Sequence, residues 1–359
     1  MLHDFNASNE RTKHRYFKVL KEARGYSEAT IDQAAASILE FERSTGFSPF
    51  GDFTEGQAIR FKEQVRSAKT QRTKKPISAA SVRSKLIAVK KFFTWYLENL
   101  PRGVRIRKDD IEFLSPSKEE LALSKTSIRE KTVPTLDQCK LLLGVMPKET
   151  AGDRRSRALI AFLCLTACRV TALTHVRLKH VDLHRWTLNL NAKEIQTKAA
   201  KSFVTPFFPV DQVFYDELED WIGYLQSKEL FSANDPLFPR LASHPDGVQG
   251  FKPAGLSRAF IQSSGTLTKL VGEIFETQRL PKTSPHRFRD MIVEAMAKWD
   301  LTVEEHKVFS LALGHSDLSV TLSSYGVPTQ QQQIEAMDRL RAKKVKKAKK
   351  DKKSKDGKK

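Results

Sequence analysis

One tyrosine near the end of the chain, Tyr325, stands in a setting that suits covalent chemistry. It ends the Ser- and Thr-rich segment LGHSDLSVTLSSYG (313–326), which begins with a Gly-His pair, and it is the only tyrosine after Tyr224. Most tyrosines in such places pack, with the hydroxyl hydrogen-bonded. The alternative is a phenolic nucleophile, and that chemistry needs cations and acid-base groups elsewhere in the chain.

Two arginines and two histidines are candidates for those groups. His286 and Arg289 are three residues apart in SPHRFRD, so they share one face of a helix that Pro285 would begin. The N-terminus of such a helix favours a phosphate. Arg169 lies between two apolar helical patterns, and His315 follows a glycine where a helix is expected to end. Core packing explains the His286–Arg289 pair poorly, whereas Arg169 and His315 taken alone could be exposed surface residues.

These residue types fit the breaking and rejoining of a DNA phosphodiester. A covalent intermediate conserves the energy of the broken bond, so that a later hydroxyl can reverse the step. The charge that builds on the pentavalent phosphate must meet preorganised cations. The planar fork of arginine binds two non-bridging oxygens at once, which lysine cannot do. Arg169 and Arg289 are the candidates, and the fold must bring them together.

Four segments, taken in order, resemble the motifs of the tyrosine recombinase, or phage integrase, family. They are TACRVTALTHVRLKHVDL (166–183), a lysine in a predicted hairpin, SPHRFRD (284–290) and LGHSDLSVTLSSYG (313–326). The resemblance covers the catalytic domain from about Thr135 to Tyr325, and the preceding helices are similar to the family's core-binding domain. It implies a site-specific recombinase or integrase of a mobile element that works through a 3′-phosphotyrosyl intermediate.

The resemblance also implies roles for the individual residues. Tyr325 is the expected nucleophile, and the groups expected at the phosphoryl oxygens are Arg169, His286, Arg289 and His315. In the family a hairpin lysine protonates the leaving 5′-oxygen. Lys198 in QTKAAKSFVTP is the best placed, with Lys201 and Lys193 as rivals. Lys201 is also a candidate DNA contact.

The sequence departs from the family pattern at several positions. Ala172 stands where an acidic residue commonly orients the first arginine, and Asp290 stands where a second histidine is frequent. The predicted lysine turn lacks the usual flanking glycines. None of these changes removes a group expected at the phosphate.

The elements that must position these residues are mainly α-helical, with a small antiparallel β-sheet. WTLNLN (186–191) and FVTPFF (203–208) are β-prone, so they predict a hairpin or a meander with a polar turn. Thr135 and Gln138 form a capping-box pattern that opens a second domain. The predicted divisions are a helical core-binding domain at 1–100, a linker at 101–130, a mixed α/β catalytic domain at 131–328, a C-terminal helix at 329–342 and a disordered Lys-rich tail at 343–359.

A helix predicted within KKPISAASVRSKLIAVKKFFTWYLENLP separates apolar and cationic residues. Its apolar stripe is Leu86, Val89, Phe93 and Tyr96. The cations that fall mostly off this stripe are Arg83, Lys85, Lys90 and Lys91. Taken alone they suggest a solvated helix face, and the hypothesis is a face that contacts DNA phosphates.

The charge of the chain points to a polyanionic partner, most often nucleic acid. The net charge is +20, and residues 341–359 hold twelve Lys or Arg and two Asp, a net +10. The remaining body is therefore basic in its own right. We expect double-stranded DNA as the partner, with the Lys-rich tail adding salt-sensitive affinity.

Three cysteines, Cys139, Cys164 and Cys168, have no framework spacing and suggest a reduced, intracellular protein. The sequence shows no signal-peptide centre and no apolar run of roughly 20 residues. It shows no nucleotide-binding glycine loop or carboxylate metal cluster. We therefore expect no cofactor, no metal, no membrane contact and a cytoplasmic, nucleoid-associated protein of prokaryotic or phage origin.

Several alternatives stay open. A type IB topoisomerase-like nicking and rejoining enzyme would share this chemistry, and a DNA-binding protein with a decayed site would keep only the binding. Assembly as a homotetramer on DNA, with possible DNA-bending accessory proteins, follows from the resemblance alone. The C-terminal helix carries Ile334, Met337 and Leu340 on one stripe. It could dock on its own domain or on a neighbouring protomer.

Overall fold

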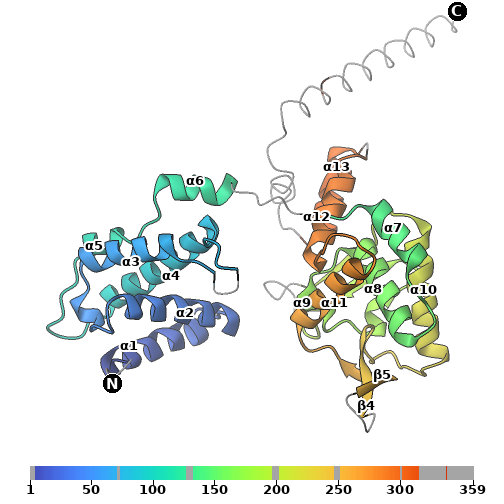
Figure 1. Ribbon diagram of the computed structural model, residues 1–359, viewed down its shortest axis with the longest axis horizontal. Coiled ribbons are helices and arrows are strands. Elements are labelled where there is room, and N and C mark those ends of the chain that lie inside the picture. The colour runs from blue at the N-terminus through green and yellow to red at the C-terminus, as the bar shows by residue number, and fades with distance from the viewer. Residues whose placement is uncertain are drawn as a thin grey trace, which may run out of the picture. The chain divides into compact units, whose positions relative to one another are not determined.

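The computed structural model describes residues 5–70, 73–126, 132–195, 202–245, 251–299, 301–314 and 337. The chain divides into two compact units, Met1–Lys131 and Thr132–Lys359, and each unit has its own hydrophobic core (Figure 1). Apart from Met337, the predicted C-terminal helix and tail lie outside the described residues.

The regular elements of the first unit, among its described residues, are all helices or helical turns. Its elements are α1 (Ala7–Lys18), the π-helical turn η1 (Val19–Ala23), α2 (Glu28–Ser44), the 3-10 turn η2 (Phe50–Asp52), α3 (Glu55–Ser67), α4 (Ala79–Glu98), α5 (Lys108–Glu112) and α6 (Lys118–Thr126). Asn6 caps α1 and Ser78 caps α4, each by accepting hydrogen bonds from backbone amides of the first turn.

Helix α4 carries the core of this unit. The predicted apolar stripe of α4 is buried in full, and Phe92 and Trp95 beside it are buried as well. The ring of Phe93 stacks on Phe53 at 4.0 Å between centroids and meets Phe41 edge-on at 5.0 Å. The apolar face of α4 is wider than the sequence predicted because other helices pack around much of its circumference.

The structure differs from the predicted linker at 101–130. Ile106, Ile111 and Leu114 are buried in the core of the first unit. The short helices α5 and α6 also contain acidic residues that pair with that unit: Lys90 binds Glu112 and Arg66 binds Glu120, each at 2.7 Å. The apolar residues spaced through this charged stretch anchor it to the helices before it.

A buried ion pair joins the first two long helices. The ammonium of Lys13 on α1 lies 2.6 Å from a carboxylate oxygen of Glu42 on α2, and the Glu42 side chain is fully buried. Glu10 provides a second acceptor at 2.7 Å. Nearby, the buried side chain of Asn9 donates to the carbonyl of Ser48 and accepts from the amide of Phe50. Helix α1 is therefore fixed to the end of α2 by polar bonds in a desolvated place.

The second unit contains helices and two small sheets. Its elements are α7 (Leu136–Val145), α8 (Ala151–Thr166), α9 (Val170–Leu173), η3 (Leu178–His180), β1 (Val181–Asp182), β2 (Thr187–Leu190), β3 (Phe203–Pro206), α10 (Gln212–Ser227), β4 (Pro239–Pro245), β5 (Phe251–Phe260), α11 (Ser264–Thr277), α12 (Pro285–Met296) and α13 (Val303–Ala312). The predicted capping box of Thr135 and Gln138 opens α7.

Helix α8 is the centre of this unit. Every residue from Arg157 to Thr166 is buried, because α7, α10, α11 and α12 surround the helix. Ala167 and Cys168, the two residues that follow α8, are buried as well. Although α8 is buried, none of the described helices is long and apolar enough to cross a membrane.

The predicted hairpin is confirmed. Strands β1, β2 and β3 form an antiparallel sheet in that order, with Leu188 opposite Thr205 and Leu190 opposite Phe203. A second antiparallel pair, β4 and β5, was not predicted from the sequence. Strand β5 contains Pro253 and Gly255, which weaken the sequence signal of a strand.

We predict that replacing Lys13 with methionine destabilises the first unit. The change leaves the Glu42 carboxylate buried without its main counter-ion, so the free energy of unfolding should fall by about 3 kcal/mol. The matched control is Lys21→Met, which removes the exposed Lys21–Glu28 pair and should change nothing measurable. Hydrogen exchange of the α1 and α2 amides in the full chain measures the stability of both variants. Equal losses of protection in Lys13→Met and Lys21→Met would contradict the prediction.

Candidate active site

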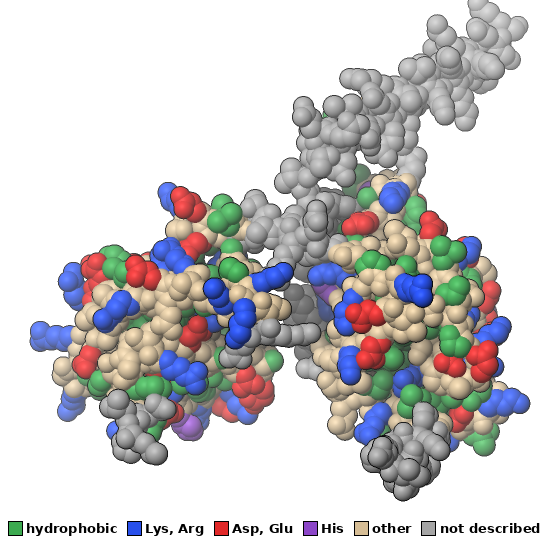
Figure 2. All heavy atoms as spheres, viewed as in Figure 1, with side chains coloured by type: hydrophobic (Ala, Val, Ile, Leu, Met, Phe, Trp, Pro, Cys, Tyr) green, Lys and Arg blue, Asp and Glu red, His purple; other side chains and the backbone are tan. Residues whose placement is uncertain are grey.

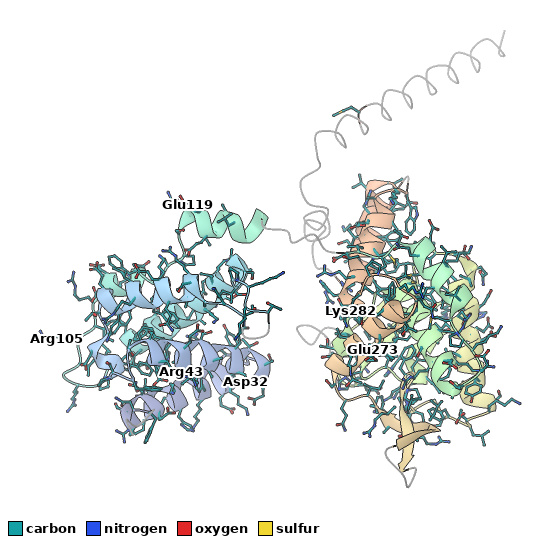
Figure 3. All side chains as sticks on the ribbon, viewed as in Figure 1. Asp32, Arg43, Arg105, Glu119, Glu273 and Lys282 are labelled. Atoms are coloured by element: carbon teal, nitrogen blue, oxygen red, sulfur yellow. The ribbon has the colours of Figure 1, made fainter. Side chains whose placement is uncertain are left out.

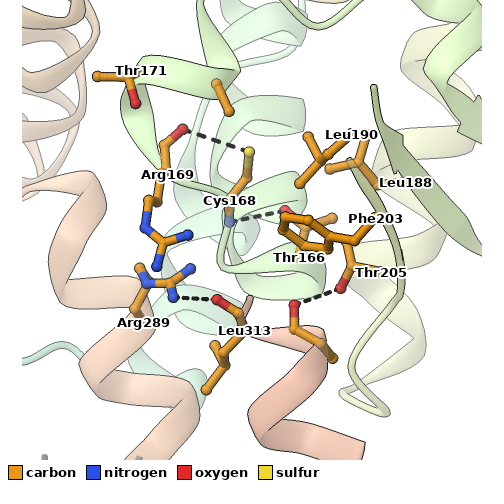
Figure 4. A pocket seen from close by; sticks show the side chains of 12 residues that line it. Thr166, Cys168, Arg169, Thr171, Leu188, Leu190, Phe203, Thr205, Arg289 and Leu313 are labelled. Atoms are coloured by element: carbon orange, nitrogen blue, oxygen red, sulfur yellow. Dashed lines mark hydrogen bonds between the residues drawn. The ribbon is translucent and has the colours of Figure 1, made fainter. Parts of the chain in front are cut away.

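Arg169 and Arg289 meet in one pocket of the second unit. Figure 4 shows the two guanidinium groups side by side, although the residues come from segments far apart in the sequence. The other residues that line the pocket are Thr166, Cys168, Thr171, Ala172, Leu188, Leu190, Phe203, Thr205, Ala312 and Leu313. The fold therefore brings together the two arginines that the sequence analysis singled out.

A left-handed turn delivers Arg169 to the pocket. Helix α8 ends at Ala167, whose φ is 46° although it is not glycine. The hydroxyl of Thr166 then accepts a hydrogen bond from the amide of Cys168 at 3.2 Å. Arg169 is the N-cap residue of the short helix α9; its backbone is extended, and its side chain lines the pocket. No described residue makes a hydrogen bond or ion pair with its half-buried guanidinium.

Arg289 ties two parts of the site together. It lies on α12, where Ser284 is the N-cap residue and Pro285 begins the helix as predicted. Its side chain is buried, and it donates to the carbonyl of Ala167 at 2.8 Å. It also donates to the carbonyl of Leu313 at 2.5 Å, the bond drawn in Figure 4. The Arg289 guanidinium thus provides hydrogen-bond donors both to the carbonyl of the left-handed residue Ala167 and to a carbonyl at the end of α13.

Both arginines are charged at neutral pH. Burial, and the nearby charge of Arg169, lower the pKa of Arg289 to about 10, which is still well above neutrality. Burial also lowers the pKa of Arg169. The thiol of Cys168 near both arginines stays neutral, because burial raises its pKa to about 12. Two positive charges therefore face one pocket with no described carboxylate between them, which favours an anionic ligand.

The loop before α12 is held against α11. Lys282, labelled in Figure 3, packs its side chain across Gly272 and pairs with Glu276 at 2.8 Å. A methyl group at position 272 would lie 3.0 Å from the Lys282 Cε atom, so the close approach uses the missing side chain. This packing sets the start of α12, which carries His286 exposed in its first turn.

Strand β3 and the end of α13 form another wall of the site. The Thr205 hydroxyl donates to the carbonyl of Ala312 at 2.7 Å. Gly314 follows α13 with a φ of 68°, and a Cβ atom there would lie 2.8 Å from the Phe203 ring and 3.3 Å from Nη1 of Arg169. Residue 314 must therefore be glycine, and the next residue in the chain is the predicted His315.

The base of the β2–β3 hairpin is fixed by polar bonds. Glu194 accepts from the Lys179 ammonium and from Nε2 of His180, each at 2.8 Å. Nδ1 of His180 accepts from the backbone amide of Arg177, so its imidazole is in the neutral tautomer with the proton on Nε2. The two hydrogen bonds from Lys179 and His180 lower the pKa of Glu194 to about 2. Glu194, which precedes the predicted lysine turn in the chain, is therefore held in place.

The structure describes only part of the predicted site. Arg169, His286 and Arg289 are described, and Arg169 and Arg289 share the pocket. Lys198, Lys201, His315 and Tyr325 lie outside the described residues. Of the lysines weighed for the hairpin, only Lys193 is described, and it is exposed. Ala172 lines the pocket, and Asp290 pairs with Arg287 on its own helix.

Sequence analysis missed two residues of this site, Phe203 and Thr205. Both face inward from β3, whereas Val204 between them is exposed. The alternation of the strand could have assigned Thr205 to the buried face. Its contact with the end of α13 spans more than a hundred residues of sequence, and no local pattern signals that contact.

The four cations predicted for DNA contact differ in their surroundings. Lys85 pairs with Glu40 at 2.5 Å and Lys90 with Glu112 at 2.7 Å. Arg83 and Lys91 form no ion pair with a described residue and line an open groove between α2 and α4. On the face drawn in Figure 2, Lys and Arg side chains are interspersed with Asp and Glu. The four cations therefore differ in whether a described acidic residue already pairs with them.

Solved structures match the fold over most of the chain, whereas no protein-family model and no curated protein matches the sequence. The integrase of the Tn1549 transposon, in complex with a circular intermediate DNA, is 15% identical with a TM-score of 0.60, covering 92% of this chain and 99% of that one. A lambda integrase dimer bound to a COC′ core site is 15% identical with a TM-score of 0.60, covering 91% and 80%.

A third match is the XerH site-specific recombinase bound to a palindromic difH substrate. It is 16% identical with a TM-score of 0.57, covering 94% of this chain and 90% of that one. These likenesses extend through both units. They show that the chain has the fold of the tyrosine recombinases and integrases.

We predict that Arg289→Lys destabilises the second unit. Lysine has a single nitrogen in place of the two guanidinium nitrogens that reach Ala167 and Leu313. We therefore expect at least one buried acceptor to lose its donor and the free energy of unfolding to fall by about 2 kcal/mol. The control is Arg287→Lys on the same helix, where lysine can keep the pair with Asp290. Urea denaturation and hydrogen exchange of the α12 and α13 amides compare the two variants. An unchanged free energy of unfolding in Arg289→Lys would show that the hydrogen bonds of Arg289 to Ala167 and Leu313 do not stabilise the second unit.

Proposed function

We propose that this chain is a tyrosine-type site-specific DNA recombinase that integrates or excises a mobile element. The observation that carries the proposal is the meeting of Arg169 and Arg289 in one pocket on the fold of the tyrosine recombinases. Two permanently charged forks in a half-buried pocket suit a phosphodiester, because each can bind non-bridging oxygens bidentately. The activity, the target and the mobile element are inferences from this arrangement.

In the proposed reaction the Tyr325 phenolic oxygen attacks the scissile phosphorus. A phosphotyrosyl bond forms at the 3′ side while the bond to the 5′-oxygen breaks, and Lys198 gives that oxygen a proton. Arg169 and Arg289 stabilise the charge on the pentavalent phosphate, with His286 and His315 as hydrogen-bond donors. The 5′-hydroxyl of a partner strand then attacks the phosphotyrosine and releases the tyrosine. No energy source is needed, since one phosphoester replaces another.

The two arginines divide the work in this proposal. Arg289 donates to two backbone carbonyls, so its position is fixed before substrate arrives. Arg169 has no partner among the described residues, and its burial lowers its pKa. A phosphate would supply the counter-charge that the described residues do not, so binding recovers part of the cost of burying Arg169. This is the preorganised electrostatic site that phosphoryl transfer requires.

The first unit is proposed to hold the DNA duplex. The Tn1549 and lambda integrase structures are complexes with DNA, which supports double-stranded DNA as the partner of this chain. Arg83 and Lys91, without acidic partners among the described residues, are the better candidates for phosphate contacts. Lys85 and Lys90 must first leave their glutamates. Assembly of four protomers on two duplexes, with or without DNA-bending proteins, extends this proposal.

The nucleophile is tested with a suicide substrate. Nicked duplex DNA carrying the element's junction sequence is incubated with the protein in EDTA and run on a denaturing gel. We expect a covalent protein–DNA band that is absent in Tyr325→Phe. In Arg169→Lys the band should form at least about 100-fold more slowly, because lysine lacks the planar fork that binds two non-bridging phosphate oxygens bidentately.

Other outcomes of that experiment have definite meanings. DNA binding without any covalent band from the intact protein would indicate a decayed site and contradict the proposal. A band together with relaxation of supercoils by a monomer, and no joining of two duplexes, would indicate a topoisomerase-like enzyme instead.

The cations of α4 are tested by salt-dependent DNA binding. We expect Arg83→Ala and Lys91→Ala to weaken binding and each to reduce the slope of log affinity against log salt by about 1. Lys85→Ala and Lys90→Ala serve as matched controls and should change the slope less, since these lysines are already paired. Fluorescence anisotropy at several salt concentrations measures the slopes. Equal slopes for all four variants would show that ion pairing in the free protein does not select the contacts.

A further inference from the structure

The guanidinium of Arg169 needs something to hold it in place. No described carboxylate, amide or carbonyl binds it, and Ala172, one turn further along, offers only a methyl group to the pocket. An arginine side chain without a partner can adopt many rotamers, and ordering it costs up to about 2 kcal/mol. Among the described residues, packing is therefore what can restrict the side chain.

The groups that surround Arg169 come from β3 and from the end of α13. A Cβ atom built on Gly314 would lie within 3.3 Å of both the Phe203 ring and Nη1 of Arg169. The Phe203 ring and the Arg169 guanidinium thus both lie against the backbone of Gly314. Figure 4 shows Phe203 and the two arginines around the same pocket. Both side chains line the same pocket, so the ring takes up part of the room around the guanidinium.

A hydrogen bond holds the Phe203 strand to the end of α13. The last carbonyls of a helix have no partner within the helix. The carbonyl of Ala312 accepts from the buried Thr205 hydroxyl, and that of Leu313 accepts from Arg289. Thr205 lies two residues after Phe203 on the same face of β3. The strand, the helix end and Arg289 therefore form one connected unit around Arg169.

We propose that Phe203 is a positioning residue for Arg169, with the Thr205 hydroxyl fixing the strand that carries it. The inference rests on the proposed function for its catalytic consequence. The ring confines the guanidinium to the orientation in which it meets the phosphate, and it touches no reacting atom itself. Losing the ring leaves Arg169 present and charged but free to turn away.

Cleavage kinetics and chemical labelling together test this role. In single-turnover cleavage of the suicide substrate, Phe203→Ala should lower the rate constant by about 10- to 100-fold, as expected for a displaced catalytic group, while DNA affinity stays unchanged. In an Arg169→Lys background the same change should cost almost nothing more. Phe203→Leu keeps an apolar side chain but removes the ring, so its rate constant should lie between those of Phe203→Ala and the unaltered protein. Val204→Ala, on the exposed face of the same strand, is the matched control and should cleave normally.

Chemical labelling tests whether Phe203 confines the Arg169 side chain, and it does not depend on DNA cleavage. Phenylglyoxal modifies accessible guanidinium groups, and mass spectrometry locates the modified residue. We expect Arg169 to react severalfold faster in Phe203→Ala and in Thr205→Val than in the unaltered protein. The exposed Arg107 should react equally in all of them. If Phe203→Ala does not fold, Phe203→Leu carries the same comparison.

Three results would overturn the inference. They are unchanged Arg169 labelling in Phe203→Ala, normal cleavage by that variant, and an additive loss in the Arg169→Lys background. A failure of the unaltered protein to form any covalent band has a different meaning. It would remove the proposed function, while the labelling would still show whether Phe203 confines Arg169.

Discussion

The second unit depends on the two hydrogen bonds that the Arg289 guanidinium donates to backbone carbonyls. One bond reaches Ala167, where a non-glycine residue holds a left-handed conformation, and the other reaches Leu313 at the end of α13. A left-handed alanine costs about 1 kcal/mol, and a helix end leaves carbonyls without partners. One buried cation offsets both costs. The same charge helps to attract an anion to the pocket, so stability and chemistry use one residue.

Much of this arrangement could be predicted from local patterns. The proline at the start of α12, the capping box of α7, the β2–β3 hairpin and the buried stripe of α4 each follow from residue spacing over a few turns. Arg169 and Arg289 were identified by chemical type and by motif order. Their convergence needed the resemblance to a known family, because spacing alone says nothing about contacts between distant segments.

The rest depended on packing across the chain. The ring of Phe203 and the hydroxyl of Thr205 act on a turn more than a hundred residues away, so their roles appear only in three dimensions. The ion pairs of Lys85 and Lys90 likewise depend on which acidic residues the fold places beside α4. Sequence pattern identified the cations, but only their surroundings distinguish paired from unpaired ones.

The apolar residues between 101 and 114 bear on how the protein can be divided for experiment. Ile106, Ile111 and Leu114 complete the first core, and α6 is bound through Arg66 and Glu120. A fragment ending at residue 100 would expose the apolar surface that these side chains cover, and it would tend to aggregate. A fragment ending at 131 keeps that core intact and divides the chain between its two compact units.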